Sequence, residues 1–224
     1  MIKVAPSILA ADFMSLGNDI KHLIDSGADY IHIDVMDGLF VPNMAFGLHA
    51  VSSIRKAASA VLDVHMMIHQ PIRYVEHFCD AGADILTVHV EADSEEEVLK
   101  ALNRIRQAGT RAALAIKPST PAEAIIPYLD HCHMILVMTV EPGFGNQLFL
   151  QSMLSKIAEV KKIIGNKNIN IEVDGGINLT TGKQCFENGA NVIVMGSALF
   201  KSEDIGGLIE SVKRFDKNIL FVDE

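Results

Sequence analysis

Histidine and aspartate occur inside three short apolar runs of this chain. His32 and Asp34 lie in YIHIDVMDG, His65 lies in LDVHMM, and Asp174 lies in NIEVDGG. Burying such side chains is unfavourable unless they are paired or bound to a metal ion. A hydrogen-bonded His–Asp pair would explain any one run. A shared metal site is the simplest explanation of all three.

Two imidazoles and two carboxylates suit a borderline divalent cation such as Zn²⁺, Mn²⁺, Fe²⁺ or Co²⁺, and the choice among these stays open. Asp34 and Asp174 also suggest acid–base chemistry, because two carboxylates flanking one carbon can remove a proton from one face and deliver one to the other. The proton would lie beside a carbonyl, with the cation stabilising the resulting enediolate. If both aspartates only hold metal, the chemistry would be that of a hydrolase or a lyase.

Three glycine-containing segments indicate phosphate binding. EPGFGNQ (141–147), EVDGGIN (172–178) and VMGSALF (194–200) each coincide with the end of an apolar run. Glycine lets the backbone approach an anion closely, and successive amides with a helix N-terminus supply donors. Each segment alone is typical of a turn, but three that converge on one face predict a phosphate site.

Three methionines, Met36, Met67 and Met138, also end apolar runs. Their polarizable thioethers could cover a planar intermediate, and ordinary core packing is the equally open alternative.

The elements that must position these residues are short, nearly continuous apolar runs separated by amphipathic stretches. Such alternation predicts a parallel sheet that is covered on both faces. We predict eight helical segments, among them 94–107 and 151–164. The eight predicted strands are 4–9, 30–36, 62–67, 85–90, 111–117, 134–140, 170–175 and 192–197.

A repeated pattern of helix end, glycine, polar residue and strand distinguishes a closed barrel from an open sheet. Its glycines are Gly27, Gly82, Gly109 and Gly189, which lie 55, 27 and 80 residues apart. These spacings are multiples of a unit of about 27 residues, and eight such units account for the 224 residues of the chain. We therefore predict a single (β/α)8 TIM-barrel domain over residues 1–224, with its site at the carboxyl ends of the strands.

Composition narrows the partners. The net charge of −9 argues against nucleic acid, and no apolar run is long enough for a membrane span. The N-terminal MIKVAPSIL lacks a signal-peptide pattern. The three cysteines, Cys79, Cys132 and Cys185, are too widely spaced for a metal or redox motif, which indicates free thiols in a reducing compartment. We expect a soluble cytoplasmic protein whose partner is a small phosphorylated metabolite.

Several motifs, in register and in order from about residue 4 to residue 200, resemble the ribulose-phosphate 3-epimerase family. The motifs are APSILAADF (5–13), HIDVMDGLFVPN (32–43), DVHMM (63–67), KPSTP (117–121), VMTVEPGFGNQ (137–147), EVDGG (172–176) and GSALF (196–200). The resemblance implies a metal-dependent barrel that interconverts D-ribulose 5-phosphate and D-xylulose 5-phosphate by inversion at C3. It also implies a homo-oligomer.

The resemblance assigns roles to individual residues. His32, Asp34, His65 and Asp174 would be the metal ligands, with Asp34 and Asp174 as the two acid–base residues. Ser7 and His65 would contact the sugar. The expected phosphate contacts are Gly143, Phe144, Gly145, Asn146, Gly175, Gly176, Gly196 and Ser197.

Three positions depart from the family pattern: Ala45, Leu48 and Asn146 stand where Thr, Pro and Gly are usual. The same C3 chemistry on D-allulose 6-phosphate, which gives D-fructose 6-phosphate, is therefore the alternative activity. A non-catalytic phosphosugar-binding barrel is a more remote one. A metal-dependent hydrolase would be expected to carry His-x-His on its first strand, and the first predicted strand contains none. A phosphosugar decarboxylase would be expected to carry an Asp-x-Lys pair on a strand, and no predicted strand contains one.

Overall fold

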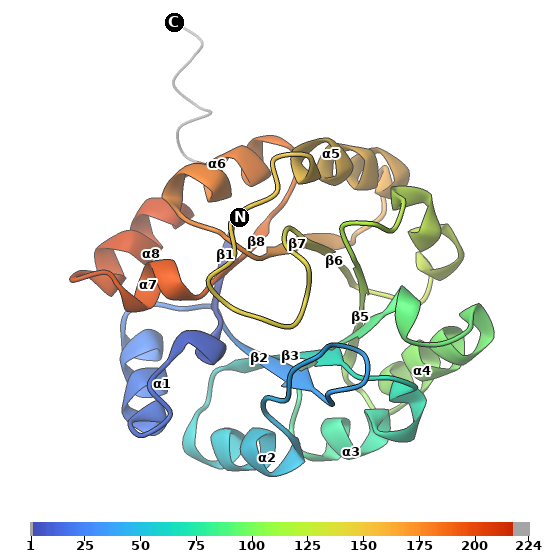
Figure 1. The fold of residues 1–224 in the computed structure, drawn as a ribbon, viewed down its shortest axis with the longest axis horizontal. Helices are drawn as coiled ribbons and strands as arrows, with labels where there is room; N and C mark the ends of the chain where they lie inside the picture. Colours follow the sequence, from blue (N-terminus) through green and yellow to red (C-terminus); the bar gives the residue numbers. More distant parts are fainter. Residues whose placement is uncertain (1, 217–224) are drawn as a thin grey trace, which may run out of the picture.

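A computed structural model describes residues 2–216 of the chain, which form eight parallel strands wrapped into a barrel (Figure 1). The strands are β1 (Lys3–Pro6), β2 (Tyr30–Met36), β3 (Val61–Met67), β4 (Ile85–His89), β5 (Arg111–Ile116), β6 (Met134–Met138), β7 (Asn170–Asp174) and β8 (Val192–Met195). Neighbours pair in the order β1-β8-β7-β6-β5-β4-β3-β2. A parallel bridge between Ser7 and His32 joins the two ends of the sheet. The predicted (β/α)8 TIM-barrel fold is therefore confirmed, and the predicted strand ends agree to within three residues.

Helices cover the outside of the barrel. They are α1 (Leu16–Asp25), α2 (Leu48–Ala57), α3 (Val75–Asp80), α4 (Glu95–Gln107), α5 (Met153–Ile164), α6 (Leu179–Glu187), α7 (Ser197–Phe200) and α8 (Ile205–Lys213). Short 3-10 turns supplement them: η1 (Ile8–Ala10), η2 (Pro71–Arg73), η3 (Val90–Ala92) and η4 (Ala122–Tyr128).

One predicted helical segment differs from expectation. The connection between β5 and β6 contains the 3-10 helix η4 and no α-helix among its described residues. Pro127 lies inside η4, and a proline cannot donate the backbone hydrogen bond that an α-helix requires at that position.

The repeated glycines adopt the conformation on which the barrel prediction rested. The φ angles of Gly27, Gly82, Gly109 and Gly189 are 91°, 101°, 82° and 114°. Residues other than glycine rarely adopt such values. Each lies just after a helix and before the next strand. The repeat therefore reflects a common helix-to-strand turn.

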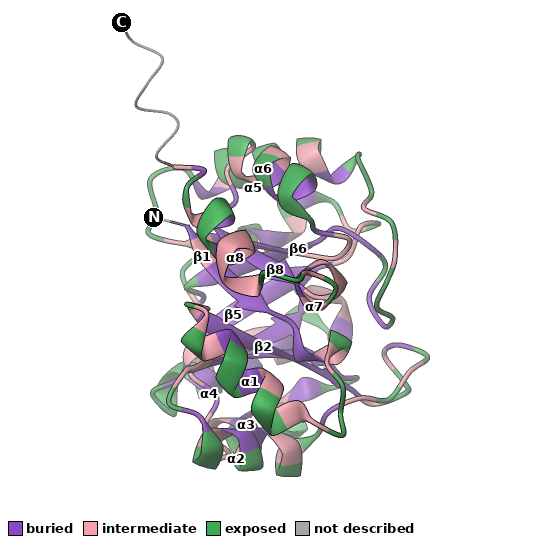
Figure 2. Ribbon diagram, turned by 90° about the vertical axis from the view of Figure 1, so that its left-hand side faces the viewer, coloured by how far each residue is buried: buried purple, intermediate pink, exposed green. Residues whose placement is uncertain are grey.

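The main apolar core lies between the sheet and its helices, with residues such as Ile33, Val64 and Ile135 facing outward from the barrel. Figure 2 shows the buried strands at the centre and the exposed surfaces on the helices. Alternate residues point into the barrel, where an apolar layer of Ala5, Tyr30, Ile85 and their neighbours fills one end. The polar side chains lie beyond that layer, toward the carboxyl ends of the strands.

The predicted domain extends to residue 224, but residue 1 and residues 217–224 lie outside the described part of the chain. Among the described helices, none combines the length and the apolar character needed to cross a membrane.

Candidate active site

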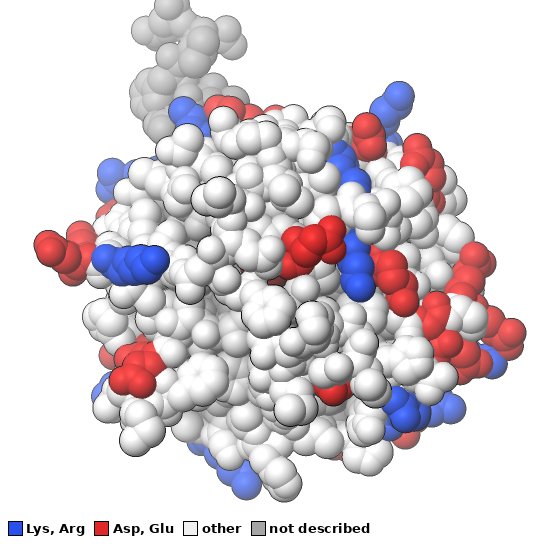
Figure 3. Space-filling model, in the orientation of Figure 1, with Lys and Arg blue, Asp and Glu red and all other residues white. Residues whose placement is uncertain are grey.

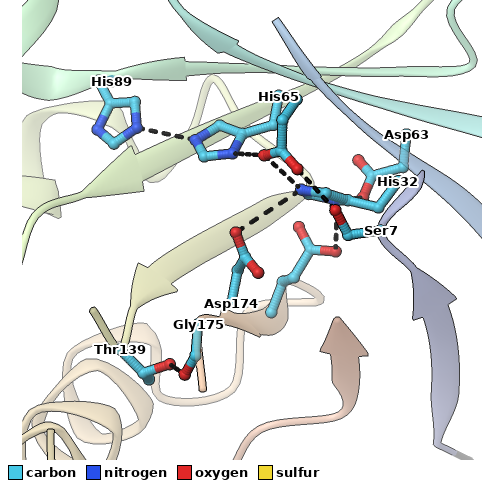
Figure 4. Close-up of polar contacts among 10 residues, drawn as sticks. Ser7, His32, Asp63, His65, His89, Thr139, Asp174 and Gly175 are labelled. Atoms are coloured by element: carbon cyan, nitrogen blue, oxygen red, sulfur yellow. Dashed lines mark hydrogen bonds and ion pairs between the residues drawn. The ribbon is translucent and has the colours of Figure 1, made fainter. Parts of the chain in front are cut away.

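The four predicted metal ligands converge inside the barrel. Figure 4 shows three of them, His32, His65 and Asp174. His65 on β3 lies opposite Asp34 on β2, and Asp174 approaches from the end of β7. His65 Nδ1 lies 3.1 Å from Asp34 Oδ1, while His32 Nε2 lies 3.4 Å from Asp34 Oδ1 and 3.9 Å from Asp174 Oδ2. One ligand atom from each of the four residues lies within 4.8 Å of the others, which is compatible with a shared cation.

Each imidazole of this cluster directs one nitrogen toward the shared space and engages the other elsewhere. His32 Nδ1 lies 2.6 Å from Asp63 Oδ2, and His65 Nε2 lies 2.8 Å from His89 Nε2. The buried His32 Nε2 has no hydrogen-bond partner among the described residues. Metal-binding histidines characteristically use one nitrogen for the ion and the other for an orienting hydrogen bond. The residues therefore fit a divalent metal.

The two aspartates have opposite pKa shifts. Burial opposes ionisation of Asp34, but the adjacent His32 and His65 hold its pKa far below the usual range. Burial and the charge of Asp34 raise the pKa of Asp174 to about 6. Burial also disfavours the charged form of His32, yet Asp63 and Asp34 raise its pKa well above 6.5. The cluster thus contains one firmly ionised carboxylate and one that gains a proton in mild acid.

The sequence analysis missed two buried carboxyl groups, Asp63 and Glu172. Both are fully buried, and with His32 they form a second cluster whose ligand atoms lie within 4.8 Å of one another. Burial and the charge of Asp63 raise the pKa of Glu172 well above its usual value. The signal was available, because each lies two positions before His65 or Asp174 and so points to the same side of its strand.

A cavity of about 260 Å³ opens above the cluster at the carboxyl ends of the strands. Asp34 and Asp174 reach its floor, and Met36, Met67 and Met138 form part of its wall. His32 and His65 are fully buried beneath the floor. The predicted sugar and phosphate contacts that line the cavity are Ser7, Gly143, Phe144, Gly145, Asn146, Gly175, Gly176, Gly196 and Ser197.

The loops after β6 and β7 build one side of the cavity. Gly176 has a φ of +67°, and a Cβ atom there would lie 2.5 Å from the backbone nitrogen of Phe149. Thr139 Oγ1 donates to the carbonyl oxygen of Gly175 at 2.6 Å, which ties the end of β6 to the same loop. The short helix α7 begins at Ser197 directly after Gly196, so its first amides lie at the cavity wall.

The loop after β2 closes another side. Asn43 Nδ2 donates to the carbonyl oxygen of Gly143 at 2.7 Å, so the loops after β2 and β6 meet across the barrel opening (Figure 1). Asn146 has a φ of 58°, and asparagine is among the residues that tolerate this left-handed conformation best. Asn146 therefore occupies a left-handed position in this turn that glycine could also occupy.

Figure 3 shows that most Lys and Arg side chains lie toward the periphery of this face, while acidic groups and one basic group lie near its centre. The described residues that line the cavity include no lysine or arginine. A bound phosphate would therefore interact mainly with backbone amides and hydroxyl groups.

Structural comparison identifies barrels with low sequence similarity. The 3-hexulose-6-phosphate synthase of Salmonella typhimurium aligns with a TM-score of 0.71 at 18% identity, over 97% of this chain and 99% of that one. A protein named KGPDC from Streptococcus mutans aligns with a TM-score of 0.72 at 13% identity, over 98% and 99% of the two chains. At such low identity these matches support the fold alone.

Sequence comparison is more specific. A family model described as "Ribulose-phosphate 3 epimerase family" matches residues 3–200. A ribulose-phosphate 3-epimerase of Bacillus subtilis is 46% identical over 95% of this chain and 99% of its own length. One of Rhodobacter capsulatus is 44% identical over 97% of this chain and 92% of its own length. Because these matches span nearly the whole chain, the protein belongs to the ribulose-phosphate 3-epimerase family.

Proposed function

We propose that this epimerase interconverts D-ribulose 5-phosphate and D-xylulose 5-phosphate by proton transfer at C3. The observation that carries the proposal is the position of Asp34 and Asp174, which reach one cavity floor from β2 and from β7. The names of the Bacillus subtilis and Rhodobacter capsulatus relatives support the choice of substrate.

In the proposed mechanism, the two carboxyl groups act on opposite faces of C3. Asp34 is ionised and can accept the C3 proton from one face, while Asp174, which reaches the cavity floor from β7, delivers a proton to the other face. The reverse reaction exchanges these roles. Ser7 Oγ donates to Asp34 Oδ2 at 2.7 Å and so holds that carboxylate in place.

The proposed ligands of a divalent cation, Zn²⁺, Mn²⁺, Fe²⁺ or Co²⁺, are His32, Asp34, His65 and Asp174. Support comes from the unpartnered Nε2 of His32 and from the mixed nitrogen and oxygen donors of the cluster. When bound, the cation supplies positive charge that stabilises the substrate oxygens next to C3 as they become negative.

The remaining proposed contacts orient the substrate. Ser7 and His65 are assigned to the sugar, His65 from beneath the cavity floor, and the glycine-containing loops are assigned to the phosphate. Met36, Met67 and Met138 would cover the planar intermediate with apolar groups that exclude water. Asn146 lies where the phosphate is expected, so D-allulose 6-phosphate is the competing substrate.

We also propose that the protein acts in the cytoplasm as a homo-oligomer. The free thiols of Cys79, Cys132 and Cys185 support a reducing compartment. Exposed apolar side chains near the cavity mouth, including Met14, Leu39 and Met44, support self-association.

Replacing one acid–base residue tests the proposal. Asp174→Asn keeps the size of the side chain but removes the proton transfer, so we expect turnover to fall by about 10³-fold or more. Asp130→Asn, the same change at an exposed carboxylate paired with Lys167, should leave turnover unchanged. Turnover of a folded Asp174→Asn protein close to that of the wild type would contradict the two-base mechanism and favour a different role for Asp174.

A further inference from the structure

The turn at residues 143–147, in the loop after β6, is shaped by hydrogen bonds within its own loop. Gln147 Nε2 donates to the carbonyl oxygens of Glu141 and Phe144 at 2.6 and 2.9 Å. These bonds close the turn, and Asn146 lies in it at a φ of 58°. They define the shape of the turn but not its position over the barrel.

The side chains of this turn do little to hold it in place. Phe144 is 55% exposed, and Leu148, directly after the turn, is 90% exposed. A Cβ atom at Gly145 would meet nothing within 4 Å. The position of the turn must therefore depend on contacts with neighbouring loops.

The loop after β2 makes two such contacts (Figure 1). Asn43 Nδ2 donates to the carbonyl oxygen of Gly143 at 2.7 Å. A Cβ atom at Gly143 would lie 3.1 Å from the Cβ atom of Val41, so the two loops also touch there. Among residues 2–216, the bond from Asn43 is the one hydrogen bond that reaches the turn from another loop.

A second hydrogen bond orients the side-chain amide of Asn43. Its Oδ1 accepts from the backbone N–H of Met44 at 2.9 Å, so its NH₂ group faces Gly143. The opposite orientation would place Oδ1 against the carbonyl oxygen of Gly143, and two acceptors cannot form a hydrogen bond. Both ends of the amide are therefore used in holding the two loops together.

The loop that carries Asn43 is itself anchored to the barrel. Asp37 Oδ1 accepts from the backbone N–H of Phe40 at 2.9 Å, and Asp37 Oδ2 accepts from that of His69 at 2.8 Å. The ring of Phe40 packs against the ring of His89, with 4.8 Å between their centroids. The loop is thus tied to the ends of β3 and β4, and Asn43 extends from a fixed support.

We propose that Asn43 is a positioning residue, which holds the turn 143–147 over the cavity so that its backbone amides can bind the substrate phosphate. This inference rests on the proposed phosphate site. Asn43 and the turn both line the cavity, whose described lining includes no lysine or arginine. Because uncharged amides bind an anion only when several point at it together, the position of the turn should determine the affinity.

Steady-state kinetics tests the effect on affinity. Asn43→Ala removes one hydrogen bond, so the KM of D-ribulose 5-phosphate should rise by about threefold to tenfold while kcat stays close to that of the wild type. The matched control is Asn188→Ala, which removes an amide donor to the carbonyl oxygen of Gln184 at the end of α6. It should leave KM and kcat unchanged. An unchanged KM in Asn43→Ala, or a loss confined to kcat, would overturn the proposal.

Nitrogen-15 relaxation of the ligand-free, Zn²⁺-loaded protein tests the position of the turn itself. For the backbone amides of residues 143–147 we expect order parameters of about 0.85 in the wild type, typical of a rigid backbone, and a fall toward about 0.6 in Asn43→Ala. Asn43→Asp keeps the acceptor for the N–H of Met44 but removes the donor, so it should cause the same fall. Flexible amides in the wild type, or wild-type order parameters in either variant, would overturn the proposal.

The two measurements separate positioning from direct contact and from a failure of the proposed function. If Asn43 only contacted the phosphate, Asn43→Ala would raise KM but leave the ligand-free turn rigid, which would overturn the positioning role. A wild-type enzyme that does not epimerise at C3 would contradict the proposed function. The order parameters would still decide whether Asn43 holds the turn.

Discussion

At the scale of single residues, the site is a group of buried carboxyl groups. Bound protons and two imidazoles offset their negative charge. Asp34, Asp63, Glu172 and Asp174 surround His32, and the pKa values of His32 and Glu172 are raised well above normal. A divalent cation would supply the positive charge that these protons otherwise provide. Metal binding and protonation should therefore compete.

This competition predicts proton release on metal binding. The raised pKa of His32 favours its protonated form in the metal-free protein, so cation binding should release that proton. Below pH 6 Asp174 is protonated as well, so the number of protons released should rise and the apparent affinity should fall more steeply. Calorimetry with Zn²⁺ in buffers of different ionisation enthalpy measures this number. In Asp174→Asn the additional release below pH 6 should disappear. Binding of Zn²⁺ without proton release, both at neutral pH and below pH 6, would contradict the assigned ligands.

The sequence was sufficient to predict the four ligand candidates because His and Asp are unusual inside apolar strands. It did not single out Asp63 and Glu172, whose importance depends on which strand each faces across the barrel. That relation is set by the register of β2 with β3 and of β6 with β7, which no local pattern contains. The opposite pKa shifts of Asp34 and Asp174 likewise depend on neighbours from other strands.

At the scale of elements, the loops after β6 and β7 line the proposed phosphate site and approach each other closely at glycine residues. Gly176 approaches the backbone of Phe149, where even a methyl group would clash. Gly165, directly after α5, is different, since its φ of +57° is similar but a Cβ atom there would meet nothing within 4 Å.

The contrast between these glycines predicts the effects of two substitutions. Gly176→Ala combines a φ of +67° with a backbone clash, so we expect about 1–3 kcal/mol of local strain. Displacement of the loop should raise the KM of the phosphosugar by roughly tenfold or more, by the equivalence of about 1.4 kcal/mol and a factor of ten. Steady-state kinetics measures the change, and Gly165→Ala, the matched control with a similar φ and no clash, should leave KM unchanged. An unaltered KM in Gly176→Ala would remove this loop from the phosphate site.

The elements themselves were largely predictable, because apolar runs and repeated glycines are local signals. The end of β1 was not, since Ile8–Ala10 turns into η1 after the bridge between Ser7 and His32. The 3-10 conformation of η4 was also missed, although Pro127 gives a local reason for it. The contact of Asn43 with Gly143 joins two loops 100 residues apart and could not be read from either one.

At the scale of the whole molecule, barrel closure creates the site. His32 and Asp34 come from β2, His65 from β3 and Asp174 from β7, so only the closed barrel brings the two aspartates to one cavity floor. The mouth of that cavity lies at the carboxyl ends of the strands, on the face that Figure 3 shows. The central claim is that this arrangement transfers protons at C3 of a ketose phosphate.

The most direct test is proton NMR of the metal-loaded enzyme in D₂O, with D-ribulose 5-phosphate and D-allulose 6-phosphate supplied separately. We expect deuterium to appear at C3 as the C3 epimer forms, because a carboxyl group that exchanges with solvent delivers the proton. D-ribulose 5-phosphate should react faster, whereas faster reaction of D-allulose 6-phosphate would reassign the substrate. The absence of C3 exchange with either sugar in the metal-loaded enzyme would contradict epimerisation by proton transfer.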